Sequence, residues 1–499
     1  MAELHFGTTL KPTKLELLTA WMGGQRWYAS KGTAPSLTRI DAWRLGDPEG
    51  EVGIETLLVL DDSDPLAPVV YQVPLTYRGA PVGGLEHALV GTMEHGVLGS
   101  RWIYDGTHDP AYAAQLLALV RGLVPVESSF ESGAVDERYA GSPATSWAED
   151  LTFRGSTVLS GEQSNTSIII DAVDGSGTAR PVIIKVFRML AAGENPDVVL
   201  QTALRDAHCE RVPAVVGSVR GEWPLAAYAE GSGATLGGGG TFHLAFAQEF
   251  LPGVEDAWRV ASRAVEAGAD FSEPARALGA ATAQVHVELA RTLGTTPTTV
   301  ETGSAIVDGM RARFEAAVAE VDALAEFAPH VERVLAAAVD ARWPAMQRIH
   351  GDYHLGQVLH SVARGWVLLD FEGEPMRPLA ERSLPDQWIR DVAGMLRSFD
   401  YCGGSLELSS GTSAREWVRS AQEAFLDGYA AASGDDPRHH EALLTAFELD
   451  KAMYEVVYEA RNRPDWVTIP LEAIARLTGT ATLTESTTST TTSTAKENT

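Results

Sequence analysis

The sequence predicts an α+β protein with two lobes, a small antiparallel sheet followed by a large helical lobe, preceded by an N-terminal α/β region. Three observations support this prediction. Strand and helix patterns alternate up to about residue 145, short apolar runs separated by turn residues follow, and Ala- and Leu-rich helical periodicity dominates after residues 251–258. At 499 residues the chain has room for roughly three domains, each with its own core.

The N-terminal region contains two segments with strand character and one with helix character. "TLLVL" (56–60) is apolar throughout, and "VVYQVPLTYR" (69–78) alternates enough to predict a half-buried strand. "PAYAAQLLALVRGL" (110–123) predicts a helix, and a Ser- and Gly-containing loop follows near residues 127–146.

The middle of the chain predicts an antiparallel sheet of about five strands, interrupted by a helix near residues 195–205. "DGSGTARP" has the turn residues of a hairpin, and "GSGATLGGGG" is a flexible connection between two strands. The predicted strands are "STVLS", "TSIIIDAV", "RPVIIKVFR", "WPLAAYAE" and "TFHLAFAQEF".

Helices account for most of the remaining chain. Residues 273–293 and 309–341 have helical periodicity, and more helices are expected between residues 390 and 476. Two short strands interrupt them around Asp352 and Asp370, which lie eighteen positions apart at the edges of apolar runs. The Thr- and Ser-rich end of the chain cannot bury a core and is expected to be disordered.

Composition and charge exclude several classes of partner. The 67 acidic and 39 basic residues give a formal charge of −28, which argues against nucleic acid and anionic membranes because both require a positive surface. Cys209 and Cys402 could form at most one disulfide, and no zinc-type spacing occurs. The N-terminus lacks the apolar core of a signal peptide, and no long apolar run is present. We expect a soluble, cytoplasmic protein.

The segment "HGDYHLGQVL" groups residues suited to phosphoryl transfer. Asp352 can orient and deprotonate a hydroxyl group, Gln357 offers an amide oxygen to magnesium, and Asp370 supplies an anionic metal ligand. An Asp beside a Gly is commonly only a turn residue, but the joint occurrence of these residues with His350 favours a catalytic site. We expect His350 to hold the loop, whereas His354 is either a loop anchor or a substrate contact.

Lys185 lies inside the apolar run "PVIIKVFR", where an unpaired ammonium group would be costly. It is therefore either a residue whose charge reaches solvent at the sheet edge or, as we favour, the lysine that binds nucleotide phosphates. Its acidic partner is either Asp197 or Glu194.

Two further segments are candidates for nucleotide binding. The loop "SGEQSNTS" (160–167), with Ser164 and Asn165, lies between two strands and could present backbone N–H groups to phosphate. The segment "AQEFLPG" (247–253), with Gln248 and Phe250, is the expected hinge whose backbone would recognise adenine.

With these motifs in place, the chain resembles the aminoglycoside-phosphotransferase-like kinases, a protein-kinase-like superfamily that usually carries Asn where Gln357 stands. A wider set of segments resembles the bacterial maltokinases and covers nearly the whole ordered chain. These segments are "QRWYASKG" (25–32), "GEQSNTS" (161–167), "HGDYHLGQVL" (350–359), "DFEGEPMRPLAER" (370–382), "RDVAGMLRSFDY" (390–401) and "ELDKAMYEVVYEARNRPDW" (448–466).

This resemblance implies transfer of the γ-phosphate of ATP, with Mg²⁺, to the anomeric hydroxyl of maltose, giving maltose 1-phosphate for α-glucan (glycogen) synthesis from trehalose-derived maltose. It implies Asp352 as the base, Gln357 and Asp370 as metal ligands, and Lys185 as the phosphate lysine; Glu372 either assists the metal or caps a turn. A monomer that can associate with a trehalose synthase is expected. The implied domains are an N-terminal cap (1–90), an intermediate subdomain with the sheet lobe (91–252), the helical lobe (253–476) and a disordered tail (477–499).

The segment 448–466 independently suits a sugar site. On a helix, Tyr454 and Tyr458 share a face, with Glu455, Glu459 and Arg461 nearby, and aromatic faces with charged groups match the ring faces and hydroxyls of a disaccharide. We expect Tyr458 and Arg461 to be the leading sugar contacts, with His354 and Glu455 beside them. The alternative is an ordinary amphipathic helix with Tyr in the core.

Two other segments are expected to be structural. Asp391 should begin a helix and tie it to the catalytic loop, and Arg26 and Trp27 should build a local core or face the kinase lobe. Two other functions remain open: a kinase for glucosamine, another hexose or an aminoglycoside, and a non-catalytic pseudokinase that holds a trehalose/maltose isomerase. The presence of Lys185 and Asp352 argues against the second.

Overall fold

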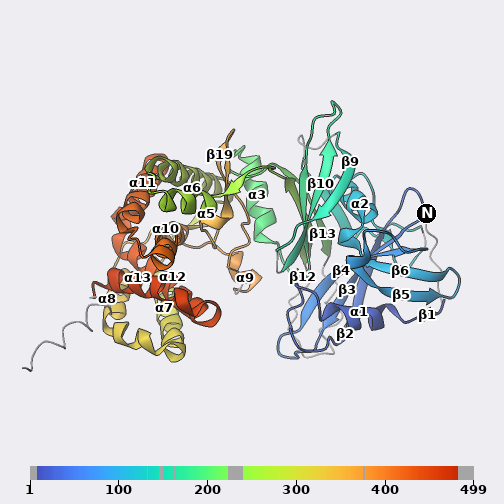
Figure 1. Cartoon of the computed structure of the whole chain (residues 1–499), viewed down its shortest axis with the longest axis horizontal. Coiled ribbons are helices and arrows are strands. Elements are labelled where there is room, and N and C mark those ends of the chain that lie inside the picture. Colours follow the sequence, from blue (N-terminus) through green and yellow to red (C-terminus); the bar gives the residue numbers. More distant parts are fainter. Residues whose placement is uncertain are drawn as a thin grey trace, which may run out of the picture. The chain divides into compact units, whose positions relative to one another are not determined.

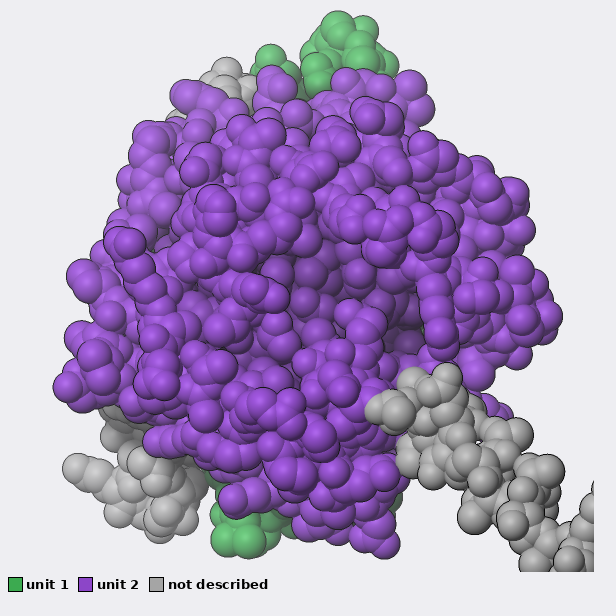
Figure 2. Space-filling view, turned by 90° about the vertical axis from the view of Figure 1, so that its left-hand side faces the viewer, with its two compact units in different colours: residues 1–199, 213–252 green, residues 200–212, 253–499 purple. Residues whose placement is uncertain are grey.

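The computed structural model describes residues 8–131, 133–144, 150–161, 164–222, 240–374 and 377–480. The chain divides into two compact units, coloured separately in Figure 2. The first contains residues 1–199 and 213–252, and the second contains residues 200–212 and 253–499.

The first unit begins with an eight-stranded antiparallel sheet in the order β1-β5-β6-β4-β3-β2-β7, with β12 paired to β4 (Figure 1). The predicted residues 69–78 form β4, but the strand is buried on both faces and not half-buried as predicted. Val70 packs into one hydrophobic core, and Tyr71 and Val73 pack into another. The strands are β1 (Leu10–Lys11), β2 (Leu37–Leu45), β3 (Gly53–Asp61), β4 (Val69–Arg78), β5 (Leu89–His95), β6 (Gly99–Asp105), β7 (Glu127–Ser128) and β12 (Met189–Leu190), accompanied by the helices α1 (Lys14–Met22), η1 (Glu86–Ala88) and η2 (Gly106–His108).

A second antiparallel sheet of six strands, in the order β8-β13-β14-β11-β10-β9, completes the first unit. Helix α2 (Pro110–Val120) contacts strands of both sheets, and one hydrophobic core includes residues of both. Its strands are β8 (Tyr139–Pro143), β9 (Thr152–Val158), β10 (Asn165–Val173), β11 (Val182–Phe187), β13 (Val215–Glu222) and β14 (Thr241–Glu249).

Several sequence expectations for this unit need correction. The predicted cap boundary at residue 90 lies inside β5, so the first sheet continues beyond it. Strands β8 and β13 were not predicted. The segment of β13, "VVGSVRGE" (215–222), contains two glycines and little alternation of apolar and polar residues. The predicted strand "WPLAAYAE" lies outside the described residues. The expected helix near 195–205 is α3 (Pro196–Asp206), which begins in the first unit and ends in the second.

The second unit is helical apart from short strands (Figure 1). Its helices are α5 (Ala257–Glu266), α6 (Ser272–Leu293), α7 (Val300–Glu320), η4 (Asp322–Phe327), α8 (Ala328–Val339), η5 (Leu355–Gln357), α9 (Leu379–Arg382), α10 (Ile389–Ser410), α11 (Arg415–Ser433), η6 (Pro437–His440), α12 (Glu441–Asn462), η7 (Pro464–Trp466) and α13 (Thr468–Thr478). Its strands are β15 (Glu255–Asp256), β16 (Thr295–Thr296), β17 (Met346–Gln347), β18 (Val358–Ser361) and β19 (Gly365–Leu368). The hairpin β18–β19 is the strand pair predicted between Asp352 and Asp370.

Helix α10 approaches the loop before η5 very closely. A Cβ atom at Gly394 would lie 2.6 Å from the carbonyl oxygen of Tyr353, so only glycine fits at this crossing. Of the helices in the described ranges, none combines the length and apolar character that crossing a membrane requires.

Candidate functional site

The loop that carries Asp352 is fixed by its own backbone and by helix α10. The Nε2 atom of His350 lies 2.7 Å from the carbonyl oxygen of Leu369, and its Nδ1 lies 3.4 Å from the Asp352 N–H. The carboxylate of Asp391 accepts the N–H groups of His350 and Gly351 at 2.8 and 2.9 Å. His350 and Asp391 therefore hold the loop, as the sequence predicts.

Asp391 is buried, and Nε2 of His286 on α6 lies 3.0 Å from its Oδ2, the oxygen that also accepts the His350 N–H. Burial opposes ionisation of this carboxyl, but the hydrogen bond and charge of His286 outweigh it, and the pKa of Asp391 lies below its ordinary value. A carboxylate that stays ionised keeps both loop hydrogen bonds.

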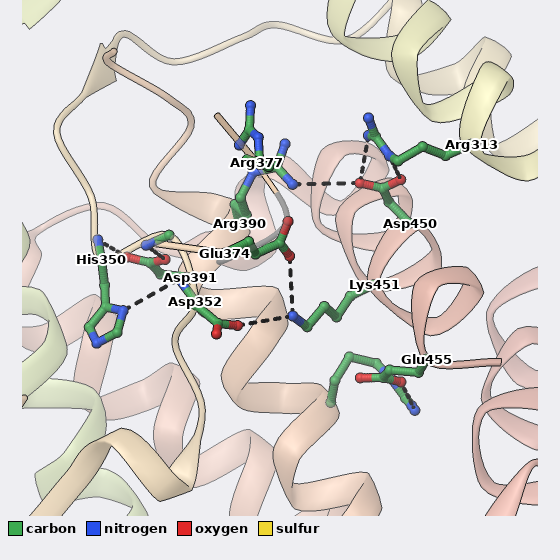
Figure 3. A network of polar contacts seen from close by, with 12 residues as sticks. Arg313, His350, Asp352, Glu374, Arg377, Arg390, Asp391, Asp450, Lys451 and Glu455 are labelled. Atoms are coloured by element: carbon green, nitrogen blue, oxygen red, sulfur yellow. Dashed lines mark hydrogen bonds and ion pairs between the residues drawn. The ribbon is translucent and has the colours of Figure 1, made fainter. Parts of the chain in front are cut away.

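Asp352 lies beside a half-buried lysine. Lys451 Nζ lies 3.3 Å from Asp352 Oδ1 and 3.2 Å from Glu374 Oε1, pointing between the two carboxylates (Figure 3). Burial lowers the pKa of Lys451, but the charges of Asp352 and Glu374 dominate and raise it. The three residues line a cavity of about 250 Å³, so a hydroxyl group bound there would meet the Asp352 carboxylate.

Arginines and acids alternate around the same cavity. Arg313 donates two N–H groups to Asp450 at 2.8 Å each, and Arg390 Nε donates to Asp386 at 2.9 Å (Figure 3 shows Arg313, Arg390 and Asp450). These pairs leave the cavity wall polar and close to charge balance, which suits a ligand with many hydroxyls.

The hairpin β18–β19 brings the predicted metal ligands together. Its register pairs Val358 with Leu368, and the Leu369 N–H donates to the Gln357 carbonyl at 2.9 Å, so Asp370 follows directly. The Gln357 amide Nε2 lies 3.3 Å from Asp370 Oδ2, and carboxylate oxygens of Asp370 and Glu372 lie within 4.8 Å of each other.

The residues of this turn fit a magnesium ion, because Mg²⁺ prefers hard oxygen donors such as carboxylates and amide oxygens. Asp370 has a φ of 61°, a left-handed conformation that side-chain-bearing residues adopt at a cost and that clusters at functional sites. Gln357 and Asp370 therefore stay candidate ligands, and of the two roles left open for Glu372 we favour the metal ligand.

Lys185 lies on β11 of the first unit, and its Nζ is 3.1 Å from Asp197 Oδ2 at the start of α3. The Lys185 side chain is 16% exposed and that of Asp197 is 1% exposed, so the pair is largely sheltered from water. Asp197, one of the two acidic partners that the sequence left open, forms this ion pair.

The structure supports only some of the nucleotide-binding roles expected for the loop 160–167 and the hinge 247–253. Asn165 begins β10 and Ser164 directly precedes it, with Asn165 opposite Phe187 of the strand that carries Lys185. Gln248 has a buried Oε1 without a hydrogen-bond partner among the described residues, which keeps it as a candidate acceptor for a ligand. The expectation for Phe250 is wrong in one respect: its N–H donates to the Pro181 carbonyl at 2.9 Å and is unavailable to a base.

An aromatic cavity of about 330 Å³ lies at the predicted sugar helix. Tyr454 and Tyr458 are stacked with ring centroids 6.4 Å apart and remain about half exposed. The cavity is lined by Trp258, His354, Gly356, Gly394, Ser398, Tyr401, Lys451, Tyr454, Glu455, Tyr458, Glu459, Arg463 and Trp466. It shares the lining residues Gly394, Lys451 and Tyr454 with the cavity at Asp352, so the two cavities are neighbours.

Arg461 does not line this cavity, and its predicted position facing the sugar is wrong. Its guanidinium is 61% exposed and donates two N–H groups to Glu320 of α7 at 2.5 and 2.6 Å. Arg463, just past the end of α12, lines the cavity instead, and its guanidinium donates to Glu459 one turn earlier.

Both glutamates of the cavity are paired with arginine. Arg397, fully buried on α10, donates Nε and Nη2 to Oε2 of Glu455 at 2.9 and 2.6 Å. Burial raises the pKa of Glu455 and Arg397 counteracts it, with a net increase. Glu459 accepts Nε and Nη2 of Arg463 at 2.9 and 2.6 Å and the Tyr401 hydroxyl at 3.1 Å.

His354 lies at the edge of the aromatic cavity and also anchors its loop, since its Nδ1 accepts the Gly356 N–H at 3.0 Å. Burial lowers the pKa of His354. The loop-anchor role is therefore seen in the structure, and the substrate contact stays a prediction.

Sequence reasoning missed Lys451, Arg397 and Arg463. Lys451 precedes Tyr454 and Glu455 by three and four residues, so helical periodicity alone could have put it on the same face. No local pattern marks Arg397 or Arg463 as partners of particular glutamates.

Two family descriptions match the chain: "Maltokinase N-terminal cap domain" over residues 21–109 and "Phosphotransferase enzyme family" over residues 211–443. A glucosamine kinase of Streptacidiphilus jiangxiensis is 30% identical over 267 residues, covering 50% of this chain and 59% of that protein. A glucosamine kinase of Mycolicibacterium smegmatis (strain ATCC 700084 / mc(2)155) is 28% identical over 358 residues, covering 66% of this chain and 82% of that protein.

Among solved structures, a glucosamine kinase in complex with glucosamine, ADP and inorganic phosphate aligns with 93% of this chain and 99% of its own, with a TM-score of 0.63 and 22% identity. A second crystal form of glucosamine kinase has a TM-score of 0.65 at the same identity. These similarities confirm the predicted fold class: a sheet lobe and a helical lobe of the kinase type with an additional N-terminal cap.

Proposed function

We propose that the chain, which matches a phosphotransferase enzyme family over residues 211–443 and a maltokinase N-terminal cap domain over residues 21–109, is an ATP-dependent sugar kinase. The proposed acceptor is maltose, phosphorylated at its anomeric hydroxyl to give maltose 1-phosphate and ADP. This product would enter α-glucan synthesis.

In the proposed reaction Asp352 accepts the proton of the anomeric hydroxyl as that oxygen forms a bond to the γ-phosphorus and the bond to the ADP oxygen breaks. Lys451 holds the Asp352 carboxylate at 3.3 Å, which fixes its direction before the hydroxyl arrives. Gln357, Asp370 and Glu372 would hold Mg²⁺, which when bound neutralises phosphate charge. Lys185, steadied by Asp197, would bind phosphate oxygens.

The observation that carries the choice of a neutral disaccharide is the pairing of both cavity glutamates with arginine. Glu455 is compensated by Arg397 and Glu459 by Arg463, so neither carboxylate offers uncompensated charge to an ammonium group. Oε1 of Glu455 receives no hydrogen bond from any described residue and can accept one from a sugar hydroxyl. The stacked Tyr454 and Tyr458 offer ring faces to a second sugar unit.

Glucosamine is the second candidate acceptor, because both relatives named above are glucosamine kinases. Against it, the amino group of glucosamine is cationic near neutral pH, and a bound sugar at Asp352 would lie beside the ammonium group of Lys451. Like charges in one cavity disfavour binding. A non-catalytic scaffold is the least supported candidate, because Lys185, Asp352, Gln357 and Asp370 are all present.

The deciding experiment is incubation with ATP, Mg²⁺ and one sugar at a time: maltose, glucose, glucosamine or trehalose. We expect maltose alone to be phosphorylated efficiently, with NMR coupling of phosphorus to the anomeric proton. Trehalose is the matched control, since it is a glucose disaccharide without a free anomeric hydroxyl. The variant Asp352→Asn controls for a contaminating kinase. Phosphorylated glucosamine with unchanged maltose would refute the maltose assignment.

A further inference from the structure

Arg188 directly follows β11, the strand of Lys185, and is fully buried. Its Nε donates to Oγ1 of Thr166 on β10 at 2.9 Å. Its Nη2 donates to both carboxylate oxygens of Asp105 at 2.8 and 2.6 Å and to Oγ1 of Thr107 at 2.9 Å. One side chain thus joins the six-stranded sheet to the end of β6 in the N-terminal sheet.

Among the described residues that contact the Arg188 side chain, all those named here except Thr166 lie in the cap, and the buried Nη1 of Arg188 has no hydrogen-bond partner among them. Asp105, Thr107 and Trp27 all lie within the matched cap segment 21–109, and the guanidinium carbon lies 4.9 Å from the Trp27 ring centroid. Burial opposes ionisation of Asp105, but the charge and hydrogen bonds of Arg188 outweigh it and lower the pKa of Asp105. Hydrogen bonds between charged groups, such as those of the buried Arg188–Asp105 pair, are stronger than neutral ones and fix the positions of both side chains.

A second cap residue binds the same strand ends. Gln72 on β4 donates Nε2 to the carbonyls of Phe187 and Leu244 at 3.0 and 2.9 Å, and its N–H donates to the Arg188 carbonyl at 2.8 Å. Strand β12, immediately after Arg188, pairs with β4. The last residues of the Lys185 strand are therefore clamped to the cap by side chain and backbone together.

Thr166 is well placed to pass this constraint on. It neighbours Asn165 and pairs with Val186 of β11, while the next residue, Ser167, pairs with Lys185. A shift of Thr166 would move Asn165 and Lys185, the two residues proposed to bind nucleotide phosphates.

We propose that Arg188 is a positioning residue through which the N-terminal cap fixes the nucleotide-binding strands, acting on ATP through Thr166 and not by contact. This assignment gives the cap a role in ATP binding and rests on the proposed kinase function. It predicts that cutting the Arg188–Thr166 hydrogen bond weakens ATP binding while leaving sugar binding unchanged.

The test uses Thr166→Val in the full-length protein, which removes the acceptor but keeps the shape and the Arg188–Asp105 pair. Thr76→Val is the matched control: Thr76 is an equally buried strand threonine whose hydroxyl bonds Asp109 at 2.9 Å, away from Arg188. We expect Thr166→Val to raise the KM for ATP about ten-fold, since hydrogen bonds to charged groups are the stronger kind. The KM for sugar should stay within about two-fold of wild type in both variants.

The dissociation constant for ATP, measured by direct titration, should rise in Thr166→Val and stay near the wild-type value in Thr76→Val. Thr166→Ser, which keeps the hydroxyl, should restore ATP binding. Equal KM values for ATP in Thr166→Val and Thr76→Val would overturn the positioning role. A rise of the KM for sugar as large as the rise of the KM for ATP in Thr166→Val would also overturn it, because it would indicate general damage to the protein. If the wild-type protein turned over no sugar and bound no ATP, the proposed function itself would fall, and this inference with it.

Discussion

Replacing Arg397 with methionine tests how much the buried Arg397–Glu455 ion pair stabilises the fold. Arg397 is fully buried, donates two N–H groups to Glu455, and also pairs with Asp400. Methionine is a long apolar side chain, so the Glu455 carboxylate would stay buried without its paired arginine, with Lys451 as the remaining nearby cation. Breaking such a pair by removing one partner costs about 3–5 kcal/mol, whereas removing an exposed pair costs about 0–1 kcal/mol.

The loss of stability should depend on pH. The pKa of Glu455 already lies above its ordinary value, because burial outweighs Arg397, and removing Arg397 should raise it further. A carboxyl whose folded pKa is raised stabilises the fold below its unfolded pKa, and this contribution is lost as pH rises through the folded pKa. Arg397→Met should therefore be more destabilised, relative to wild type, at about pH 8 than at about pH 5.

Urea unfolding followed by helical circular dichroism measures this difference. Arg311→Met is the matched control, because Arg311 pairs with Asp308 and Glu332 at the surface. The double variant Arg397→Met/Glu455→Gln should recover part of the lost stability, since no buried charge then remains on Glu455. A loss under about 1 kcal/mol, or one equal at both pH values, would refute the reasoning.

Three other changes give distinct expectations. Asp352→Asn should abolish phosphorylation while nucleotide binding, measured by calorimetry, changes less than about two-fold, because the amide cannot accept the proton; retained turnover would identify a different base. Arg463→Ala should raise the KM for maltose about ten-fold by freeing Glu459, whereas Arg461→Ala should change it less than about two-fold, since Arg461 pairs outside the cavity; the opposite ranking would restore Arg461 as the sugar contact. Burial raises the pKa of Glu448 from 4.5 to about 7, so stability present below its ordinary pKa is lost as pH rises through about 7. Glu448→Gln should remove roughly 3 kcal/mol of this pH dependence in urea titrations from about pH 5 to about pH 8, and an unchanged slope would contradict it.

The elements that the sequence predicted best are those with a strong local pattern. Strand β4 and helices α2 and α6 follow their predicted ranges within a few residues, because alternation and helical periodicity are properties of neighbouring residues. Strand β13 was missed because its glycines weaken the pattern and its partners β8 and β14 come from distant segments. The predicted helix over residues 309–341 is two helices, α7 and α8, joined by η4.

The residues of the candidate site also differ in how well the sequence predicts them. Asp352, Gln357 and Asp370 could be identified because a short hairpin brings them together within one segment. Arg461 was expected at the sugar and Arg463 was not, although both lie in the same block. Their difference arises at the end of α12, where Arg461 meets Glu320 of α7 and Arg463 turns back onto Glu459.

The sequence by itself determined the two-lobed α+β fold, the chemical groups of the catalytic loop and the helix that carries the tyrosines. Each of these follows from residue type and short spacing along one covalent chain. Only the tertiary structure decided which charges neutralise each other: Arg397 with Glu455, Lys451 with Asp352, and Arg188 with Asp105. Those pairs join residues 58, 99 and 83 positions apart, and their geometry depends on how separate elements pack, which no local pattern encodes.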